Sequence, residues 1–375
     1  MEVAVLGGGY AGVAVTRRLV NQLPGDITVT IVDRSGTHVI QHELHRLIRR
    51  PELESMLRID LSTLVPGAEV RQATVRTIDT TVPCVDLTDG SVLSPDVLVI
   101  CLGAVTATYG LPGVIEHGIP LKRLRDATAI RRRIESLGPV DRVVVGGAGL
   151  SGIQVAGEIA AINAGPEVTL VEQQRTIAPG FPEAFRSTVH DSLVRAGVIV
   201  ETDVTVERAT SDHIIFADGS DLAHRLFIWT GGITGSEALG GDRPSVKADL
   251  RLDDRTFALG DAVRVIDDQG NRAPAAAQTA VRQAPVAARN VARLLDADRS
   301  GKFVFEPRMD RYRYDSPGWA VSIGDDAVAT VGDRVLSGRP AVALKASIEA
   351  GYLGSLGRIA DAVDVIRTEL LDPAR

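Results

Sequence analysis

The apolar residues of this chain gather in short runs of strand length, and two of these runs enter the same kind of glycine-rich turn. Residues 2–6 lead into GGGYAG at 7–12, and residues 142–146 lead into GAGLSG at 147–152. In both copies, apolar residues follow the turn at helical spacing. The pattern therefore predicts a strand, a G-x-G-x-x-G turn and a helix, formed twice.

After each turn, the same features follow in the same order. A second apolar strand ends on an acid about 25 residues beyond the turn. A tight D-G turn joins two later strands, and a continuous apolar run, as in a strand buried on both faces, ends in glycine. In the two copies these features are Asp33 and Glu172, residues 89–90 and 218–219, and residues 97–103 and 226–232. This repetition predicts two Rossmann-like dinucleotide-binding domains.

The residue types of this construction suit a bound dinucleotide. The first glycine permits a sharp turn, the second lets the backbone approach a pyrophosphate, and the third lets helix and strand pack closely. Unpaired N–H groups at the helix N-terminus favour a diphosphate. Asp33 and Glu172 would accept hydrogen bonds from adenosine ribose hydroxyls, and an acid at this point repels a 2′-phosphate. Glu172 therefore favours NADH over NADPH, although the nearby Arg175 weakens that preference.

A third segment distinguishes the two sites. Residues 255–262 (RTFALGDA) resemble the xxFAxGDxA signature of flavoproteins with two dinucleotide-binding domains, in which the strand end and the Asp contact the ribityl chain of the flavin. The resemblance implies that the first copy binds FAD and the second binds NADH. Because the signature follows the second copy, the NAD domain is inserted in the FAD domain.

The predicted fold is α/β, with two Rossmann-like domains and a small C-terminal domain. The predicted limits are 1–112 and 246–305 for the FAD domain, 113–245 for the NAD domain, and 306–375 for the C-terminal domain. The predicted FAD contacts are Gly7, Gly9, Tyr10, Ala11, Gly12, Asp33, Gly103, Gly260, Asp261 and Gln278. The predicted NADH contacts are Gly147, Gly149, Leu150, Ser151, Gly152, Glu172 and Gly232.

Residues 274–295 have helical periodicity and a proline at their start. In this fold such a helix directs its N-terminus at the flavin pyrimidine, where the helix dipole stabilises the negative charge of reduced flavin. Pro285 lies inside the segment. We expect it to kink or interrupt the helix near residues 281–283, because proline removes a backbone hydrogen bond.

Composition and charge exclude some classes of protein but do not identify the function. The 375 residues are 45% hydrophobic and 24% charged, as in a soluble globular protein, and the net charge of −7 gives no basis for a nucleic-acid surface. The longest apolar run, near residues 97–105, is too short to cross a bilayer, and the first residues lack a secretory signal. Two cysteines are too few for a disulfide framework, so a cytoplasmic location is expected.

The whole chain resembles the type II NADH dehydrogenases, which are single-subunit NADH:quinone oxidoreductases. Residues 37–44 stand where that family has a His-x-Phe-Gln-Pro-Leu-Leu segment beside the flavin, and residues 277–284 (AQTAVRQA) resemble its A-Q-x-A-x-Q-Q-G motif near the quinone. Residues 318–324 resemble part of its C-terminal domain. The resemblance implies that hydride passes from NADH to the flavin and that electrons then pass to a quinone. The candidates for the acceptor side are Gln278, Gln283 and Glu158.

The chain departs from the family at three positions. Gln154 stands where the family usually has a Glu, a candidate for proton delivery, and a neutral amide cannot carry a proton at pH 7. Glu158, one helical turn further on, either substitutes for that Glu or is a solvated or capping charge. Arg282 replaces one Gln of the family's Q-Q pair, and His42 replaces its Pro. Arg282 either stabilises an anionic reduced acceptor or pairs with an acid.

Cysteine and histidine chemistry is interpreted as structural. Disulfide reductases need a redox-active cysteine pair, and sulfide:quinone reductases need cysteines that face the flavin, so Cys84 and Cys101 are predicted to be packing residues. His38, His42 and His45 could share one helical face and so suggest a metal. Without a local cysteine or acid cluster, a flavin-facing histidine or a surface helix is preferred and no metal is predicted.

Apolar residues near the C-terminus recur at helical spacing. The stripe consists of Leu353, Leu356, Ile359, Val363, Ile366 and Leu370. The opposite face mixes acids and bases, unlike the basic face that binds anionic lipid. Two interpretations stay open: binding to the cytoplasmic face of a membrane, as in type II enzymes, or packing on the protein's own core or on the second subunit of a homodimer.

Three functions therefore stay open. The leading one is an NADH:quinone oxidoreductase, peripheral on the cytoplasmic face of the membrane. A soluble NADH diaphorase, or electron donor to a redox protein, is favoured by Gln154 and by the mixed charge of the face opposite the C-terminal stripe. A redox-responsive binding flavoprotein would instead turn over slowly and keep a long-lived complex of reduced flavin with NAD.

Overall fold

The chain folds into two compact units, each built from segments that are far apart in the sequence. The computed structural model describes residues 1–301, 307–316 and 318–371, without the side chain of Leu371. The first unit comprises Met1–Val39, Arg58–Val105 and Ile233–Asp315, and the second comprises Ile40–Leu57, Thr106–Gly232 and Ser316–Arg375. The predicted domain limit at residues 305–306 lies outside the described residues, and the division into cofactor domains stays a prediction.

The first unit is centred on a six-stranded sheet in the order β21-β22-β9-β1-β2-β5. Its inner strands pair in parallel, and the edge pair β21–β22 is antiparallel. Inner parallel strands are covered on both faces, which accounts for their continuous apolar sequences. The strands are β1 (Glu2–Leu6), β2 (Thr28–Asp33), β5 (Glu69–Gln72), β9 (Val97–Ile100), β21 (Arg251–Asp253) and β22 (Thr256–Ala258).

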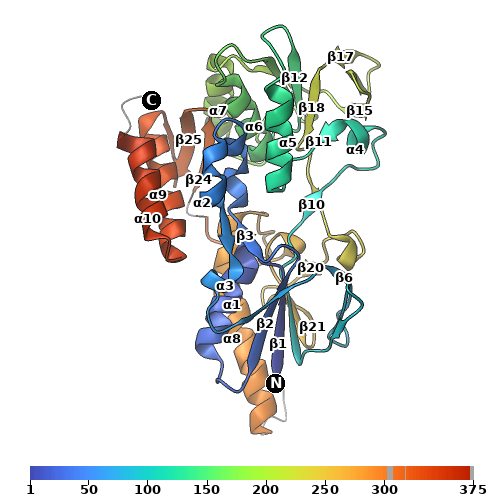
Figure 1. Ribbon diagram of the computed structural model, residues 1–375, viewed down its shortest axis with the longest axis vertical. Coiled ribbons are helices and arrows are strands. Elements are labelled where there is room, and N and C mark those ends of the chain that lie inside the picture. Colours follow the sequence, from blue (N-terminus) through green and yellow to red (C-terminus); the bar gives the residue numbers. More distant parts are fainter. Residues whose placement is uncertain (302–306, 317, 372–375) are drawn as a thin grey trace. The chain divides into compact units, whose positions relative to one another are not determined.

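Two long helices of this unit run side by side along the sheet (Figure 1). These are α1 (Tyr10–Gln22), which follows the first glycine turn, and α8 (Ala277–Ser300). The smaller elements are β3 (Thr37–Val39), β4 (Arg58–Asp60), α3 (Leu61–Leu64), β6 (Val75–Asp79), β7 (Cys84–Leu87), β8 (Val92–Leu93), η3 (Glu237–Leu239), β20 (Ser245–Val246), η4 (Gly260–Ala262) and β23 (Arg264–Val265). Short strands β10 (Val105–Thr106) and β19 (Ile233–Thr234) stand at the limits of the units along the chain.

The second unit repeats this design with a five-stranded parallel sheet in the order β11-β18-β12-β13-β14. Its strands are β11 (Gly118–Ile119), β12 (Arg142–Gly146), β13 (Glu167–Glu172), β14 (Ile199–Thr202) and β18 (Leu226–Trp229). Its helices are η1 (Gln41–Ile48), η2 (Pro51–Leu53), α2 (Glu54–Leu57), α4 (Val114–His117), α5 (Leu124–Ile134), α6 (Leu150–Ala160) and α7 (Glu183–Arg195).

The order β18-β12-β13-β14 matches β9-β1-β2-β5 strand for strand. A three-stranded antiparallel meander accompanies each sheet, β6-β7-β8 in the first unit and β15-β16-β17 in the second. The second meander consists of β15 (Val206–Ala209), β16 (His213–Phe216) and β17 (Asp221–Ala223). The predicted α/β fold with two Rossmann-like halves is confirmed.

The C-terminal residues belong to the second unit, where they form an antiparallel sheet and helices. The elements are β24 (Trp319–Ile323), β25 (Asp326–Val331), β26 (Arg334–Ser337), α9 (Arg339–Ser355), α10 (Ile359–Ile366) and the π-turn η5 (Arg367–Leu371). The sheet packs tightly on α6, because a Cβ on Gly157 would lie 2.6 Å from the Cα of Ile323. Only a glycine at this position in α6 permits so close an approach.

Two helix predictions need correction. Helix α8 begins at Ala277 rather than near Pro274. Pro285 was predicted to kink or interrupt the helix near residues 281–283. No interruption occurs there, and a kink stays a prediction. Packing within the first unit, mainly against α1, stabilises helix α8 through its buried side chains. The C-terminal stripe is divided between α9 and α10, because Gly357 adopts a left-handed conformation (φ 84°) that ends α9.

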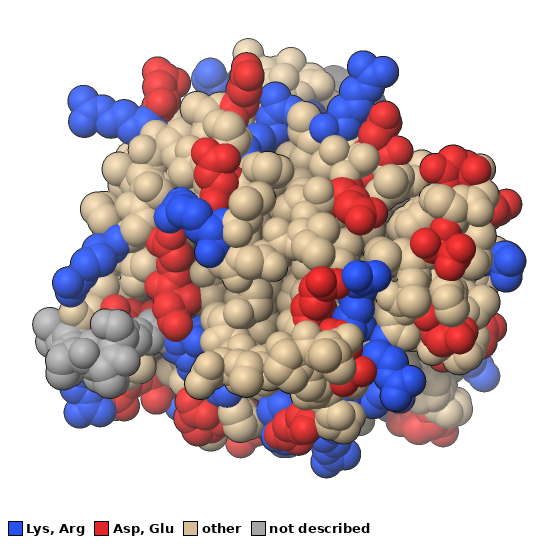
Figure 2. All heavy atoms as spheres, turned by 90° about the horizontal axis from the view of Figure 1, so that it is seen from above, with Lys and Arg blue, Asp and Glu red and all other residues tan. Residues whose placement is uncertain are grey.

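The charge of the surface and the hydropathy of the helices are the two properties relevant to membrane contact. Over the face shown in Figure 2, acidic and basic side chains are interspersed. Among the helices that the structure describes, each is too short or too polar to span a membrane.

Candidate functional site

The first glycine turn is shaped by contacts that leave no room for side chains at two of the three glycines of its G-x-G-x-x-G motif. A Cβ on Gly7 would lie 2.4 Å from the carbonyl oxygen of Cys101, and a Cβ on Gly12 would lie 1.8 Å from the carbonyl oxygen of Gly7. Around Gly9, by contrast, the described residues outside its own chain neighbours and helix leave the Cβ position open to 4 Å. The open place is at the glycine where a Rossmann turn brings its backbone against a pyrophosphate.

The second glycine turn has the same geometry. A Cβ on Gly152 would lie 1.9 Å from the carbonyl oxygen of Gly147, and one on Gly147 would lie 2.7 Å from the Cα of Gly231. Gly149 again has open space at its Cβ position. Both turns therefore form a cradle, with open space at the middle glycine, at the N-terminus of a helix, α1 in one unit and α6 in the other, as a diphosphate requires.

Each turn is fastened to the acid that ends the next strand. The carboxylate of Asp33 accepts hydrogen bonds from the backbone N–H of Gly8 (2.9 Å) and of Ser35 (2.8 Å). The carboxylate of Glu172 accepts the corresponding bonds from Ala148 (2.8 Å) and Gln174 (2.9 Å). A carboxylate has about four acceptor positions, so each acid retains capacity for a ribose hydroxyl while it fixes the turn.

The predicted flavin segments of the first unit meet at Gly260. A Cβ on this residue would lie 3.0 Å from the Cβ of Ala11 and 3.4 Å from that of Ala280. The backbone N–H of Gly260 donates to the side-chain oxygen of Gln283, which is buried (2.8 Å). Near the start of α8, the hydroxyl of Thr279 is buried without a hydrogen-bond partner in the described protein. The first turn, the GDxA segment and α8 therefore come together, with an unsatisfied hydroxyl that a bound ligand could satisfy.

The remaining predicted residues of this unit surround the same segments. Gly103 has open space at its Cβ position and a left-handed φ of 68°. Asp261 follows Gly260 in η4, and its carbonyl oxygen accepts a hydrogen bond from the buried Arg243 (2.6 Å). Gln278 is half-buried in the first turn of α8. The sequence analysis did not find Arg243, since an isolated arginine carries no local motif.

Tyr10 and His38 form a second contact on the first turn. The ring of His38 is fully buried, its Nδ1 lies 2.9 Å from the carbonyl oxygen of Gly8, and Tyr10 packs on it edge to face at 5.1 Å. Because a carbonyl only accepts, Nδ1 carries the proton. His38 lies in β3, whereas His42 and His45 lie in η1. The three histidines therefore do not share one helical face, as the metal hypothesis would have required.

Neither cysteine has the environment of a redox residue. Cys101 is buried at the end of β9, and burial raises the pKa of its thiol. Cys84 is half-buried in β7, and both thiols are free. A neutral, buried thiol is a poor nucleophile, which fits a packing role.

The acceptor-side candidate of the second unit, Glu158, is an internal charge. It is 2% exposed and forms an ion pair with Arg49 of η1 at 3.0 Å, so the interpretation as a solvated or capping charge is wrong. Burial raises the pKa of Glu158, although Arg49 opposes the shift. One turn earlier in α6, the amide nitrogen of Gln154 lies 3.4 Å from both the Nε2 of His45 and the hydroxyl of Ser322. Burial lowers the pKa of His45 well below its ordinary value, so this imidazole is neutral.

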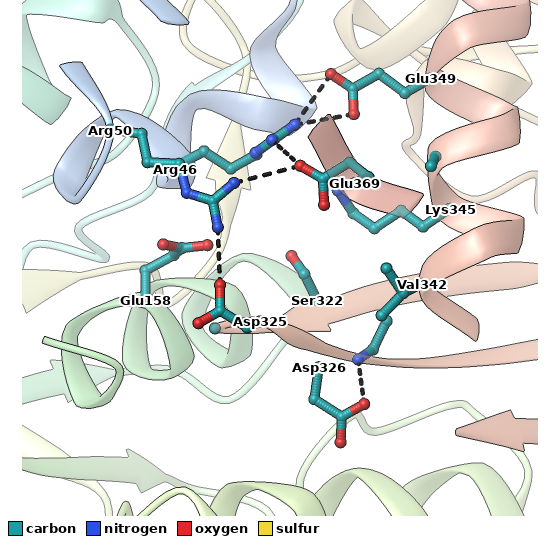
Figure 3. A pocket seen from close by; sticks show the side chains of 13 residues that line it. Arg46, Arg50, Glu158, Ser322, Asp325, Asp326, Val342, Lys345, Glu349 and Glu369 are labelled. Atoms are coloured by element: carbon teal, nitrogen blue, oxygen red, sulfur yellow. Dashed lines mark hydrogen bonds and ion pairs between the residues drawn. The ribbon is translucent and has the colours of Figure 1, made fainter. Parts of the chain in front are cut away.

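Glu158 belongs to a buried ionic network that joins η1, α6 and the C-terminal elements (Figure 3). In Figure 3, Arg46 points toward Glu349 of α9 and Glu369 of η5, and Arg50 points toward Asp325. Among the described residues, the network contains five carboxylates and four basic side chains: Glu43, Glu158, Asp325, Glu349 and Glu369 with Arg46, Arg49, Arg50 and Lys345.

The carboxylates of the network differ in protonation. Burial tends to raise the pKa of Glu43, but Lys345, 2.7 Å away, and the neighbouring cations outweigh it and lower the pKa. Burial and the repulsion of Glu43 raise the pKa of Glu349 to about 7, against the attraction of Arg46. Because its pKa is about 7, Glu349 holds a proton over part of the neutral pH range. The sequence analysis missed this network because its members look like ordinary surface charges on amphipathic helices.

The predicted nucleotide contacts of the second unit lie at the glycine turn and after β18. Leu150 and Ser151 begin α6, and Gly232 follows β18 with a φ of 141°. The hydroxyl of Thr230, which was not predicted, lies within hydrogen-bond distance of the carbonyl oxygens of Gly146 (2.9 Å) and Gly147 (2.8 Å). Predicted residues Gln278 and Gln283 belong to the first unit and Glu158 to the second.

This fold and these two cradles define a class of proteins, the oxidoreductases that bind a flavin and a nicotinamide dinucleotide on paired Rossmann-like units. The chain belongs to the pyridine nucleotide-disulphide oxidoreductase family, whose model matches residues 1–284. It is therefore an oxidoreductase that uses FAD and a pyridine nucleotide, and the residues of the two cradles fit both. The predicted family resemblance is confirmed.

Several proteins are similar to this chain over most of its length. The type II NADH:quinone oxidoreductase of Staphylococcus epidermidis is 26% identical over an alignment of 397 positions, gaps included, that covers 96% of each chain. The NADH dehydrogenase-like protein YutJ of Bacillus subtilis is 24% identical over 233 residues, which are 62% of this chain and 65% of that protein. The structure of NDH2 from Plasmodium falciparum in complex with NADH superposes with a TM-score of 0.80 at 15% identity, over 99% of this chain and 98% of that one, and shares its fold.

Proposed function

We propose that this protein is a single-chain NADH:quinone oxidoreductase that holds FAD on the first glycine turn and NADH on the second. The observation that carries the proposal is the extent of the similarity to the Staphylococcus epidermidis enzyme. It spans 96% of both chains and so includes the C-terminal sheet and helices beyond the family model at residues 1–284. Dinucleotide sites alone are shared by many oxidoreductases, whereas the C-terminal elements are not part of a Rossmann unit.

Each cofactor is assigned residues in one unit. In the first unit, Gly9, Asp33 and the N-terminus of α8 hold FAD, with Gln283 fixing the Gly260 turn. In the second unit, Gly149 and Glu172 hold the nicotinamide nucleotide. The negative charge of Glu172 lies where a 2′-phosphate would be, which favours NADH over NADPH. The bound flavin supplies the two-electron chemistry, and the chain contributes position, electrostatics and exclusion of water.

The groups proposed for the acceptor half of the reaction differ in chemistry. Quinone reduction consumes protons, and Gln154 cannot supply one. The buried network around Glu158 and Glu349 contains a carboxyl that holds a proton near neutral pH, and Gln278 offers an amide donor in the first unit. We assign Gln278, Gln283 and Glu158 to the acceptor side on these grounds.

Attachment to a membrane surface is part of the proposal. On α10, Ile359 is 63% exposed and Val363, one turn further on, is 59% exposed, while Val365 is buried. On α9, Ile348 is 53% exposed. Exposed apolar side chains at i and i+4 suit insertion into the interface of a bilayer, and the ion pairs Arg358–Asp361 and Arg367–Asp364 keep the rest of the helix polar.

A soluble NADH diaphorase is the second candidate. It is favoured by Gln154, which contacts His45 and Ser322 in place of the acid found in the type II enzymes. A diaphorase passes single electrons to an artificial or protein acceptor and needs no proton donor at the acceptor site. Both candidates share the NADH and FAD half of the reaction and differ only in the acceptor.

Anaerobic stopped-flow absorbance separates the candidates. NADH is mixed with the purified flavoprotein to follow bleaching of the flavin, and the reduced protein is then mixed with a soluble quinone analogue or with ferricyanide. The proposal predicts rapid bleaching and rapid recovery with the quinone. Bleaching that ferricyanide reverses and quinone does not would leave the diaphorase. Reduced flavin that persists with both acceptors would indicate a redox-responsive binding protein.

A further inference from the structure

Tyr109 is held in an uncommon conformation beside the second glycine turn. Its φ of 53° lies in the left-handed region that bulky residues rarely adopt, and 67% of the side chain is exposed. A strained, solvent-facing aromatic residue costs stability without burying apolar area in return. Strain of this kind persists only where surrounding contacts impose it, and it is concentrated at binding sites.

The contacts that impose the conformation come from the strand beside the turn. The phenol of Tyr109 donates a hydrogen bond to the carbonyl oxygen of Gly231 (3.1 Å), and a Cβ on Gly232 would lie only 2.2 Å from the phenol oxygen. Two residues earlier, the carbonyl oxygen of Ala107 accepts a bond from the indole of Trp229 (2.7 Å), and its N–H donates to Gly232 (3.0 Å). The ring is therefore fixed over the end of β18.

This position relates directly to the nucleotide cradle. Gly231, which Tyr109 contacts, lies close to Gly147 of the turn. A Cβ on Gly147 would be 2.7 Å from the Cα of Gly231. In the sheet, β18 and β13 flank β12 on opposite sides. Glu172 ends β13, where the adenosine ribose binds, and the pyrophosphate lies over the turn after β12. The side of β18 is therefore left for the nicotinamide half of the dinucleotide.

The other copy of the construction supplies an internal comparison. Gly103 stands in the first unit where Gly232 stands in the second, at the end of the equivalent strand β9. Apart from its chain neighbours, none of the residues that the structure describes comes within 4 Å of its Cβ position. The ring over Gly232 is thus a feature of the second unit and not of the shared design.

We propose that Tyr109 is a binding residue for the nicotinamide half of the pyridine nucleotide, against which its exposed ring packs while its phenol anchors it to Gly231. This inference rests on the proposed nucleotide site of the second unit. An aromatic ring that contacts a planar ring of a ligand contributes affinity without donating or accepting a proton. Tyr109 therefore sets the affinity for the nucleotide and leaves the reaction itself to the cofactors.

The test compares two ligands on matched variants by calorimetry. Tyr109→Gly removes the ring and suits the left-handed φ, so it is not expected to lower thermal stability. It should weaken NAD⁺ binding about tenfold, the size of one lost ring contact, and leave ADP-ribose, which lacks nicotinamide, unchanged within about twofold. Tyr109→Phe keeps the ring and should stay within about threefold for both. Val140→Ala, at a residue that is 96% exposed in the same unit, is the control.

Each outcome decides the inference. Unchanged NAD⁺ affinity in Tyr109→Gly, or an equal loss for NAD⁺ and ADP-ribose, would overturn it, since the second result means that the residue only shapes the turn. Stopped-flow bleaching of the same variants should show a raised NADH concentration for half-maximal rate with the limiting rate retained. If NADH fails to bleach even the wild-type flavin, the proposed function fails, and calorimetry still decides the role of Tyr109.

Discussion

The backbone N–H of Ala148 donates a hydrogen bond of 2.8 Å to the carboxylate of Glu172, 24 residues further along the chain. Glu172, the acid proposed to bind a ribose, therefore also stabilises the conformation of the glycine turn. Its other oxygen accepts from Gln174. The arrangement makes the conformation of the turn depend on the same charge that discriminates between nucleotides.

Replacement of this acid should change nucleotide preference. In Glu172→Gln, the amide has one oxygen for two backbone N–H groups and no longer repels a 2′-phosphate. We expect NAD⁺ affinity to fall by roughly fivefold or more. The ratio of NADP⁺ to NAD⁺ affinity should rise about tenfold, which corresponds to a difference of about 1.4 kcal/mol in binding free energy. Calorimetric titration with both nucleotides measures this. Asp33→Asn is the matched change in the other unit and should lower flavin content instead. An unchanged nucleotide ratio in Glu172→Gln would contradict the assignment.

Glycines of one turn should respond differently to the same added methyl group. Gly9 has an ordinary φ of −76° and open space at its Cβ, so Gly9→Ala should fold normally and lose bound FAD. A Cβ on Gly12 collides with the carbonyl of Gly7, so Gly12→Ala should lower the free energy of unfolding by about 1–3 kcal/mol. Flavin absorbance per protein and thermal melting separate the two effects. Full flavin content in Gly9→Ala would show that FAD is not held at that cradle.

The ionic network should make stability depend on pH. Burial raises the pKa of Glu349 to about 7 from an ordinary value of 4.5, so the folded state binds this proton more tightly than the unfolded state. The stabilisation is fully present below about pH 4.5 and is lost as the pH rises to about 7, a change on the order of 3 kcal/mol. Glu349→Gln should remove this part of the slope in denaturant titrations between about pH 5 and pH 7.5.

A control for this measurement exists on the surface. Glu135 forms an exposed ion pair with Arg131 on α5, so Glu135→Gln should leave the slope as it is in the wild type. If Glu349→Gln kept the full pH dependence, another group of the network would hold the proton.

Membrane attachment should depend on the exposed face of α10. Replacing Ile359 and Val363 together by Asp places two charges where apolar side chains would enter the interface. We expect co-sedimentation with vesicles of phosphatidylcholine and phosphatidylglycerol to fall at least about fivefold, with NADH-dependent bleaching retained. Val140→Asp, at a residue that is distant in sequence and 96% exposed, should bind vesicles like the wild type. Equal binding by the double variant would exclude this face.

Local sequence patterns were sufficient for the two nucleotide-binding turns. The turn at 7–12 and its copy at 147–152 depend on glycine spacing, and the strands that precede them depend on continuous apolar runs. The acids Asp33 and Glu172 end their strands as predicted. These features are short-range, so a chain of about 30 residues contains all the information needed to recognise them.

Longer-range patterns were less reliable. The C-terminal stripe has helical spacing from Leu353 to Leu370, but Gly357 divides it between two helices. Pro285 was expected to kink or interrupt a helix that in fact continues through it without interruption. In both cases the backbone follows tertiary packing and turn geometry, which periodicity alone does not contain.

The sequence by itself determined the class of fold, its duplication and the position of each glycine cradle. Only the tertiary structure decided which charges are internal: Glu158 and Arg49 are 109 residues apart, and Arg46 and Glu349 are 303 apart, yet both pairs are in contact. It also decided that the ring of Tyr109 is fixed over Gly231. Glycine turns and strand ends depend on neighbouring residues. Burial and ion pairing depend on the packing of segments that are distant in the sequence, which no local pattern contains.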